Sequence, residues 1–592
     1  MLLDEAPLPN RAANQSFWYS RGGDDAREAN QTSVMRFEER ASYTSNLVFE
    51  FGEPIDLDLQ NEARLLVHAG KMQRRKDLSF GLKNLAELFV MLFDHYLLLA
   101  KPKQQDETIK YHVYGRPIPL ELLILVNFTD PPKRRSGSIM ALSRSTPRIT
   151  DDTQLSKDLE IAYGGRVLYP CRIQRRGHPG DPMTLYVESE HARNEWRERL
   201  QAAIARRKHV LSLSQIFDVR LLCDVSCAPL PSRNVVVSSD NMKPHGRVTC
   251  SVPFESPDGR ELIAVGSTDG VWFGFSHNPS SFRHVLLLKN VSQCAVLADL
   301  AFFLVLADGV LVAFDLHALI SPPRGASTRA TKPPQALCEE GVFVEFFCVG
   351  LLNGRPSVVC MNRKGTTSLF HIFTPNLPDL PEYRECNDMF RLHREFFIPS
   401  EAYDLVFLGS KISILCPKGF EVMDVTEFYS VTLPVREDTR LRLMTKRHGV
   451  CRPIGMIRTT EGHFLLCYKA FGFYVDNHGD PCSSSSIIEW EGVAERVAWH
   501  PPYVLLFSPT FIEVRHAMTG RLAQIIPGIG VGCLYDGRRR VPYLDDWSPG
   551  VPQEPRVHGL MRPGSAPSND TPAEQEAQFV FELVPTIPAY SP

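Results

Sequence analysis

Four cations stand close together in the first quarter of the chain, after a short apolar segment. Lys71, Arg74, Arg75 and Lys76 follow the strand-like residues Leu65–Gly70. We place them in the first strand-to-strand turn of a small β-barrel. Several cations converging at an open barrel end can bind a phosphorylated inositol head group. The expected second strand, Glu87–Phe93, adds no further cation, so a solvated basic turn and weak attraction to anionic membranes remain open as alternatives.

A second basic group, Arg172, Arg175 and Arg176, stands in a later predicted hairpin and is a further candidate for the same anionic lipid. Between the two groups, Lys133-Arg134-Arg135 precedes Ser136. Phosphate beside arginine forms strong charge-assisted pairs, so Ser136 is a candidate phosphorylation site. A basic, solvated loop is the alternative for this run.

Motifs for covalent, metal or nucleotide chemistry are missing from the sequence. It contains no G-x-x-x-x-G-K-[ST] loop, no H-E-x-x-H, no G-x-S-x-G and no kinase set. Cys223 and Cys227 form a C-x3-C pair with no second pair at zinc spacing, so buried thiols are the simpler interpretation. We therefore predict no catalytic residues, no metal site and no cofactor.

Length and composition limit the class of protein. The chain has 592 residues, enough for two to four domains, and a hydrophobic fraction of 43% that supports large cores. Its net charge of −3 gives no general signal for nucleic acid. The most apolar stretch, Ala86–Ala100, is interrupted by Asp94 and His95 and is too short to span a bilayer. With 14 cysteines expected as free thiols and no signal-peptide pattern at Met1–Asn10, we expect a cytoplasmic protein that can lie peripherally at the inner face of the plasma membrane.

The elements that must position these cations are short strands followed by one helix. The helix is centred on Trp196, and Ala192, Leu200 and Ile204 continue its apolar stripe, while the arginines take the other faces. This pattern predicts a small barrel closed by a helix, although any α+β domain with a terminal helix would also fit. The predicted strands are Leu65–Gly70, Leu88–Phe93, Tyr96–Ala100, Tyr111–Tyr114, Leu120–Phe128, Tyr163–Arg172 and Thr184–Glu188, with residues 129–160 as a disordered insertion.

After about residue 215 a loose repeat of strand, glycine turn and strand begins. Ile263–Val265 leads through Asp269-Gly270 to Val271–Phe273, and Phe303–Leu306 leads through Asp308-Gly309 to Val310–Phe314. Asp-Gly supplies the positive φ that tight hairpin turns need. The turns recur about every 40 to 55 residues, the length of a four-stranded propeller blade. Six such hairpins predict a propeller of six or seven blades; a sandwich array or a pair of barrels is the alternative.

The composition suggests four segments. Residues 1–46 are polar and are expected to be disordered, residues 47–210 form the barrel unit, and residues 215–545 form the propeller. Residues 546–592 are rich in Pro, Ser and Gly and are expected to be a disordered tail. Within this tail, Phe579–Val584 is either a strand that closes the ring or a frayed end.

The order of these parts resembles the C-terminal half of fungal Rho-family guanine nucleotide exchange factors, in which a pleckstrin-homology (PH) domain precedes a citron-homology (CNH) propeller. Several stretches carry the resemblance: Leu47–Phe49, Phe51–Leu57, Glu62–Leu65, Gly70–Met72, Phe93–Leu98, the Trp196 helix, and the hairpins Ile263–Trp272 and Phe303–Phe314. It implies a mainly β fold, a PH-like barrel with a C-terminal helix followed by the CNH propeller. In that family a helical Dbl-homology (DH) domain precedes the PH domain and performs the exchange, and we expect no such domain before Gly52.

The resemblance implies a regulatory or scaffold module of Rho signalling without catalysis of its own. Its expected partners are a Rho-type GTPase or that GTPase's exchange factor, and an anionic membrane lipid such as a phosphoinositide, but no nucleic acid. A functional exchange factor whose DH domain is missing from this chain is one alternative. A CNH-type vesicle-trafficking adaptor is the other.

Overall fold

The computed structural model describes residues 43–49, 57–59, 61, 63–75, 85–105, 108–134, 167–178, 180, 182–225, 243–256, 258–320, 331–376, 388–435, 438–449, 451–459, 462–482, 487–537, 554–563 and 577–586. It divides into two compact units, residues 1–176 with 180–213 and residues 177–179 with 214–592. The candidate residues Lys76 and Ser136, and nearly all of the predicted segment 1–46, lie outside the described residues.

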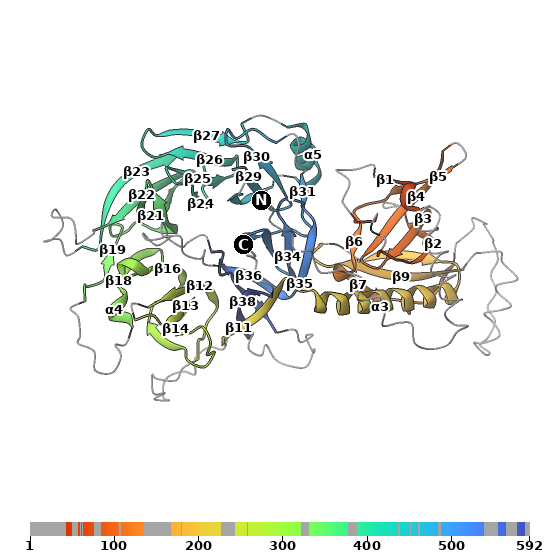
Figure 1. Cartoon of the computed structure of the whole chain (residues 1–592), viewed down its shortest axis with the longest axis horizontal. Helices are drawn as coiled ribbons and strands as arrows, with labels where there is room; N and C mark the ends of the chain where they lie inside the picture. Colours follow the sequence, from red (N-terminus) through yellow and green to blue (C-terminus); the bar gives the residue numbers. More distant parts are fainter. Residues whose placement is uncertain are drawn as a thin grey trace, which may run out of the picture. The chain divides into compact units, whose positions relative to one another are not determined.

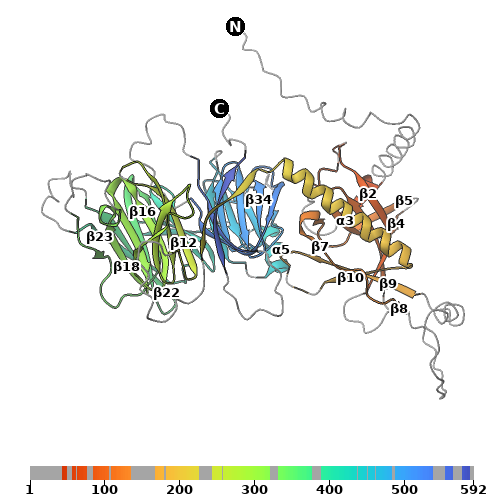
Figure 2. The same ribbon diagram turned by 90° about the horizontal axis from the view of Figure 1, so that it is seen from below.

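Unit 1 is built on one sheet of ten strands, ordered β1-β5-β4-β3-β2-β10-β9-β7, with β6 beside β4 and β8 beside β9 (Figures 1 and 2). The long helix α3 runs along the strands of this unit in both views. The elements are β1 (Leu47–Val48), β2 (Leu66–Arg75), β3 (Leu85–Phe93), β4 (Tyr96–Gln105), β5 (Thr108–Val113), β6 (Ile118–Pro119), the 3-10 turn η3 (Leu120–Leu122), β7 (Leu123–Asn127), β8 (Lys133–Arg134), β9 (Val167–Arg175), β10 (Met183–Val187) and α3 (Glu190–Leu213).

The apolar run of β3 and β4 is explained by two cores, one on each face of the sheet. Successive side chains of a strand point to opposite faces. Leu88, Val90 and Leu92 accordingly enter the core under α3, whereas Met91 and Phe93 enter a second core on the other face. A strand that is covered on both faces has apolar residues at successive positions instead of alternating apolar and polar residues.

The second core corrects the predicted boundary at residue 46. Tyr43, which we expected in a disordered segment, packs its ring 5.2 Å from that of Phe89 and 5.5 Å from that of Tyr111. Leu47 and Leu57 join the same core. Described residues between 43 and 59 thus supply part of the cover of the sheet. The insertion also starts later than expected, because β8 still pairs with β9.

Helix α3 closes the barrel, as its apolar stripe predicts. Trp196 is 3% exposed and packs in the main core with Leu200 and Ala203. One expectation about this helix is wrong, because Arg193 is buried rather than on a solvated face. Its guanidinium lies 5.2 Å from the Tyr169 ring and donates to the carbonyl oxygen of Asp130 at 2.8 Å. A helix has 3.6 residues per turn, so its buried face includes positions three as well as four residues from Trp196. Arg193 is three residues before Trp196 and therefore lies on this face.

Unit 2 is a propeller of seven four-stranded blades in the described residues, arranged around a common centre (Figure 1). Blade 1 is β12 (Val248–Glu255), β13 (Glu261–Ser267), β14 (Gly270–Phe275) and β15 (Arg283–Leu286); blade 2 is β16 (Val291–Leu297), β17 (Phe302–Ala307), β18 (Val310–Asp315) and β19 (Gln335–Ala336); blade 3 is β20 (Val344–Leu352), β21 (Arg355–Lys364), β22 (Thr367–Pro375) and β23 (Phe390–Ile398); blade 4 is β24 (Asp404–Phe407), β25 (Lys411–Cys416), β26 (Gly419–Asp424) and β27 (Tyr429–Leu433).

The other three blades complete the ring. Blade 5 is β28 (Pro453–Arg458), β29 (Phe464–Tyr468), β30 (Phe471–Val475) and β31 (Ile488–Glu489); blade 6 is β32 (Arg496–His500), β33 (Tyr503–Ser508), β34 (Phe511–His516) and β35 (Leu522–Pro527); blade 7 is β36 (Ile529–Tyr535), β37 (His558–Arg562), β38 (Gln578–Pro585) and β11 (Phe217–Val225). Short helical segments are η5 (Ala298–Leu300), α4 (Leu316–Leu319) and α5 (Thr439–His448).

Blade 7 closes the ring by pairing strands from the two ends of the propeller segment. β11 runs antiparallel to β38 from Phe217 opposite Pro585 to Val225 opposite Gln578. The first strand of each of blades 1 to 6 contacts the first strand of the next, and β36 contacts β12. The predicted tail 546–592 is therefore wrong in part: β37 and β38 belong to the propeller, and Phe579–Val584 lies in the strand that closes it. In the sequence, β38 stands well after the last hairpin of the predicted repeat. Its apolar residues are nevertheless buried, because they fill the core of blade 7.

Glutamine side chains, two of them buried and one part-buried, join neighbouring blades. The Gln524 side chain accepts from the backbone N–H of Phe217 at 2.9 Å and donates to its carbonyl oxygen at 2.9 Å. Gln293 accepts from the N–H of Phe347, and Gln578 accepts from that of Val248. An amide can satisfy both kinds of backbone group, so each bridge leaves fewer buried polar atoms without a partner.

Replacing Trp196 by alanine should destabilise the barrel by about 3–5 kcal/mol, because it removes a large buried side chain and leaves a cavity. Calorimetric unfolding of the full chain should show the transition of unit 1 moving to lower temperature while that of unit 2 stays in place. The control is Leu213→Ala, at the end of the same helix and 77% exposed, which should change stability by less than about 0.5 kcal/mol. Equal effects of the two substitutions would contradict the capping role of Trp196.

Candidate functional site

A basic pocket on the barrel brings together cations from two strands that are not adjacent. It has a volume of about 430 Å³ and is lined by Arg74 of β2, Lys101 and Lys103 of β4, and Tyr114, with Glu87 of β3 also on its wall. β3 lies between β2 and β4 in the sheet. The cations therefore project across the intervening strand toward one shared space.

The ring of Tyr114 organises two of these cations. The Nζ atom of Lys101 lies 4.2 Å from the ring centroid, and the Cζ atom of Arg74 lies 5.2 Å from it. Cation–π attraction holds both groups near one ring although they repel each other. An anion entering the pocket would relieve this repulsion, so the arrangement is suited to a phosphate group.

The structure divides the first predicted cluster. Lys71, Arg74 and Arg75 lie within β2, not in a turn. Residues three apart in a strand point to opposite faces, so Lys71 is directed away from the pocket that Arg74 lines. The Nζ atom of Lys71 instead pairs with Glu87 Oε1 at 2.9 Å, and hydrogen bonding to that carboxylate raises the pKa of Lys71. Glu87 is opposite Gln73, so its side chain lies on the Lys71 face although the residue also borders the pocket.

In the second predicted cluster, Arg172 does not join the first cluster. Thr184 is opposite Arg172 and Leu185 is opposite Arg74, so these two arginines lie on opposite faces of the sheet. Arg172 Nε pairs with Asp130 Oδ2 at 3.0 Å. Arg175 is buried at the end of β9, and Arg176 follows this strand. Arg172 is thus held apart from Arg74, whereas lipid binding by Arg175 and Arg176 stays a prediction.

Sequence reasoning missed Lys101, Lys103 and Tyr114. A signal was present, because Lys101 and Lys103 alternate at the end of the apolar strand Tyr96–Ala100. Two cations two residues apart share a face of a strand. The cations that complete the pocket therefore directly follow the third predicted strand, Tyr96–Ala100, and lie in β4, which is longer than predicted.

The propeller exposes an aromatic pair on blade 4, which is a candidate docking point for a protein. Phe428 is 51% exposed and Tyr429 is 63% exposed at the turn between β26 and β27. Arg394 of blade 3 donates to the carbonyl oxygen of Val425 at 2.7 Å, and its Cζ atom lies 5.7 Å from the Phe428 ring. Aromatic and arginine side chains on a rigid support are the residues that most often dominate protein interfaces.

A Ser–His–Glu string in the propeller has the composition of a catalytic triad but not its exposure. Ser251 Oγ lies 2.9 Å from His558 Nδ1, and His558 Nε2 lies 3.9 Å from Glu582 Oε1. All three side chains are buried between blade 1 and blade 7. Burial lowers the pKa of His558 to about 3, so the ring is neutral. Because Ser251 is closed off from any substrate, the string serves to join two blades.

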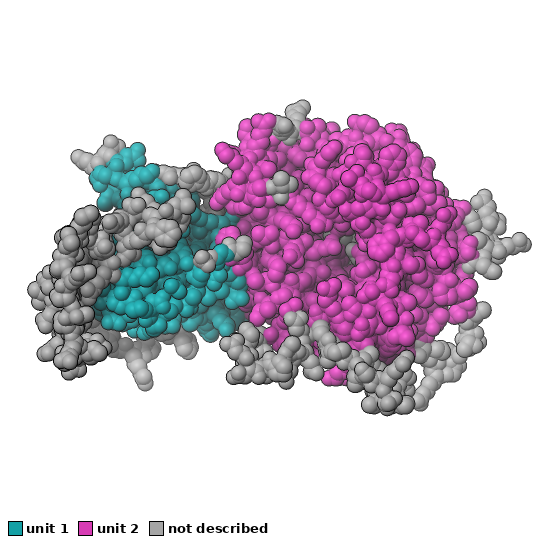
Figure 3. All heavy atoms as spheres, turned by 180° about the vertical axis from the view of Figure 1, so that it is seen from behind, with its two compact units in different colours: residues 1–176, 180–213 teal, residues 177–179, 214–592 magenta. Residues whose placement is uncertain are grey.

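The described part of the chain offers no cluster of metal ligands. Within the ranges given above, no group of His, Cys, Asp or Glu side chains could hold a metal ion, and every described cysteine is a free thiol. No helix in this part of the chain is long and apolar enough to cross a membrane. The space-filling view shows unit 2 hollowed near its centre (Figure 3).

A helix-closed barrel followed by a seven-bladed ring defines the class of protein, and comparison with known families agrees. Residues 66–203 match the family described as the pleckstrin homology domain, and residues 259–537 match the CNH domain family. The chain therefore carries a PH domain followed by a CNH domain, and the predicted resemblance is confirmed.

The curated relatives that match are Rho1 exchange factors of yeasts. "Rho1 guanine nucleotide exchange factor 1" of Schizosaccharomyces pombe is 29% identical over 508 residues, which cover 84% of this chain and 35% of the relative. "RHO1 GDP-GTP exchange protein 2" of Saccharomyces cerevisiae is 23% identical, and the match covers 83% of this chain and 35% of the relative. Across six such relatives the chain spans between 30% and 43% of their length. A solved structure described as "AfRom2 CNH domain" is 24% identical, with a TM-score of 0.46, and the match covers 62% of this chain and 99% of the solved chain.

The neutral state of His558 predicts a pH effect on stability. Its pKa is about 3 in the folded chain and 6.5 for an unperturbed histidine, so between these values the unfolded chain binds more protons. The stabilising contribution is complete above pH 6.5 and falls as the pH drops, by about 2 kcal/mol near pH 5.

Urea unfolding of the parent chain and of His558→Gln should therefore converge in stability as the pH falls from about 7.5 to about 5. His277→Gln, which changes an exposed histidine of blade 1, is the matched control and should run parallel to the parent. A constant difference between parent and His558→Gln across this range would show that His558 is not held neutral.

Proposed function

We propose that this chain is a PH–CNH regulatory module of Rho GTPase signalling. Its PH domain biases it toward anionic membrane, and its propeller docks a Rho-type GTPase or a partner of that GTPase's exchange factor. The observation that carries the proposal is the order of the two domains in one chain, together with six relatives named as Rho1 exchange factors that match mainly over the same region.

The lipid arm of the proposal rests on the basic pocket. Arg74, Lys101 and Lys103 line a space open to solvent and large enough for a phosphorylated head group. Lys71 adds attraction to an anionic surface without entering that space. The expected ligand is a phosphoinositide, and the expected location is the inner face of the plasma membrane, where such lipids supply negative charge.

The protein arm rests on the propeller. Propellers present broad surfaces built from loops, and such surfaces carry binding more often than buried strands do. The aromatic pair Phe428 and Tyr429 is the part of the described surface that we assign to GTPase docking. Its two rings are presented by a turn that Arg394 holds in place, so little entropy is lost when a partner covers them.

Nucleotide exchange by this chain alone is not part of the proposed function, although the relatives are named for that activity. In the family that the sequence resembles, exchange requires a rigid helical surface against the GTPase switch regions. Apart from residues 43–45, the described helical residues belong to α3, which packs on the barrel, to the turn η3 and to short segments in the propeller. A barrel and a propeller do not supply such a surface.

Loss of one charge inside the pocket should weaken lipid binding more than loss of one charge outside it. Arg74→Gln in the full chain should lower affinity for vesicles containing a phosphoinositide by at most about fivefold, and Arg74→Gln with Lys101→Gln by at most about 30-fold, at about 1 kcal/mol per charge. The matched control is Lys71→Gln, on the same strand but the opposite face.

Sedimentation with phosphoinositide vesicles, phosphatidylserine vesicles and neutral vesicles separates the alternatives. Equal losses for Arg74→Gln and Lys71→Gln would favour non-specific attraction over a site. If the parent chain binds none of the anionic vesicles, the pocket cations Arg74, Lys101 and Lys103 are solvated basic residues and not a lipid site.

The full chain should bind a Rho-type GTPase with a dissociation constant in the micromolar range and should leave nucleotide release at its intrinsic rate. Phe428→Ser with Tyr429→Ser should weaken binding by about tenfold or more, because aromatic anchors dominate such interfaces. Leu287→Ser, at a residue that directly follows β15 of blade 1 and is 86% exposed, is the control and should bind like the parent.

Binding is measured by biolayer interferometry with GTPase loaded with GDP or a GTP analogue, and release by fluorescent nucleotide with an intact exchange factor as positive control. No binding in either nucleotide state would contradict the docking role. Release well above the intrinsic rate would contradict the regulatory assignment and favour a functional exchange factor.

A further inference from the structure

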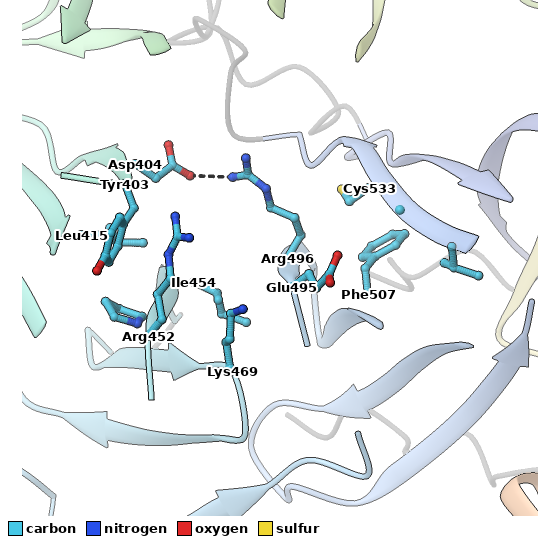
Figure 4. A pocket seen from close by; sticks show the side chains of 13 residues that line it. Tyr403, Asp404, Leu415, Arg452, Ile454, Lys469, Glu495, Arg496, Phe507 and Cys533 are labelled. Atoms are coloured by element: carbon cyan, nitrogen blue, oxygen red, sulfur yellow. Dashed lines mark hydrogen bonds and ion pairs between the residues drawn. The ribbon is translucent and has the colours of Figure 1, made fainter. Parts of the chain in front are cut away.

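A polar cavity opens along the centre of the propeller, where the inner strands of blades 4, 5, 6 and 7 meet. Its volume is about 450 Å³. It is lined at the starts of β24, β28 and β32 and along β36 (Figure 4). This size falls within the range of sites for small molecules.

Three consecutive blades contribute residues at equivalent positions. Tyr403, Arg452 and Glu495 each directly precede the first strand of their blade. Ring closure brings these positions together although they are far apart in the sequence. Lys469, which follows β29, adds a second cation to the wall.

Arg452 is held in place by a ring rather than by a carboxylate. Its Cζ atom lies 3.7 Å from the centroid of the Tyr403 ring. No ion pair of Arg452 occurs among the described residues. A guanidinium that rests with its face on a ring keeps its N–H edge available for a planar, bidentate acceptor.

Arg496 is oriented by a buried carboxylate. Its Nη1 atom donates to Asp404 Oδ2 at 3.0 Å, and Asp404 Oδ1 accepts from the N–H of Leu405 at 2.9 Å. Arg496 has five N–H donors, so the pair with Asp404 leaves others for a ligand. Glu495 also lines the cavity, and Figure 4 shows its carboxylate on the side of Phe507, away from the Arg452 guanidinium.

The Arg452 guanidinium is partly buried, and the charges around it are of both signs. Burial is the largest influence and lowers the pKa of Arg452. Tyr403 and Asp404 raise this pKa, whereas Arg496 and Arg363 lower it. Arginine nevertheless stays protonated in proteins. The cost of holding this charge without a partner carboxylate would be relieved by a bound anion.

We propose that this cavity binds a small molecule carrying at least two phosphate groups. Arg452, Lys469 and Arg496 are the residues assigned to its phosphates. The volume exceeds what one oxyanion fills, and cations contributed by two neighbouring blades suit separate phosphate groups on one molecule. The site is distinct from the basic pocket of the PH domain and does not depend on the proposed role in Rho signalling.

The test uses inorganic tripolyphosphate as the probe and isothermal titration calorimetry as the measurement. The full chain carries Arg74→Gln and Lys101→Gln throughout, so that the PH pocket does not contribute. We expect a dissociation constant in the micromolar range, at least tenfold weaker binding after Arg452→Gln, and an intermediate loss after Arg452→Lys, which keeps the charge but not the planar fork. Sulfate, a single oxyanion, should bind more weakly than tripolyphosphate.

Arg458→Gln is the matched control, because Arg458 is exposed at the other end of the same strand, β28, and should leave binding unchanged. Thermal unfolding establishes that each variant is folded. Equal losses for Arg452→Gln and Arg458→Gln, or no binding of tripolyphosphate, would overturn the proposal. Binding of an acidic peptide such as oligoglutamate in preference to tripolyphosphate would also overturn it and assign the cavity to a protein segment.

Discussion

Closure of the propeller ring by β11 and β38 is the constraint on which the larger unit depends. Without β11, blade 7 would have three strands, and β38 would expose backbone N–H and C=O groups as a template for aggregation. Antiparallel pairing of β11 with β38 covers that edge and ties together the two ends of the propeller segment, and the side chain of Gln524 fixes the start of β11 to blade 6. Once the ring is closed, the first strands of all seven blades face one axis. Tyr403, Arg452 and Arg496 can then line one cavity, because they stand at the inner edges of consecutive blades.

Polar residues buried between blades serve this closure rather than chemistry. Arg515 pairs with Glu491 at 2.8 Å and also with Glu513, and it donates to the carbonyl oxygen of Gly520 at 2.6 Å. Ser251, His558 and Glu582 join blade 7 to blade 1 in the same way. A buried charge is tolerated only when it is paired and hydrogen-bonded, so such networks also fix which blades are neighbours. Their residue types resemble those of an active site, and only their burial distinguishes them from one.

The two candidate anion sites differ in how they are built. The PH pocket takes its cations from strands on either side of β3 and is open to solvent, which suits a head group that arrives on a membrane. The propeller cavity places its arginines on an aromatic ring and a buried carboxylate, which fixes their orientation before a ligand binds. Preorganised donors lose less entropy on binding than flexible surface lysines do. The first site is therefore suited to recruitment and the second to selective recognition.

The sequence by itself determined the classes of element and their order. The stripe around Trp196 predicted the closing helix, and the Asp-Gly turns predicted hairpins; Asp308 and Gly309 indeed have φ of 48° and 75°. These signals are local, because a helix face or a turn is decided by neighbours in the chain. The alternation of side chains along a strand could also have shown that Lys71 and Arg74 lie on opposite faces. That inference requires both residues to be in the strand, and the predicted strand ended at Gly70, whereas β2 continues to Arg75. Only the tertiary structure decided that residues 558–562 and 578–585 complete blade 7, that Arg193 is buried and that Arg452 meets Tyr403. Each depends on partners distant in the sequence, and periodicity carries no information about which distant strand a segment will join.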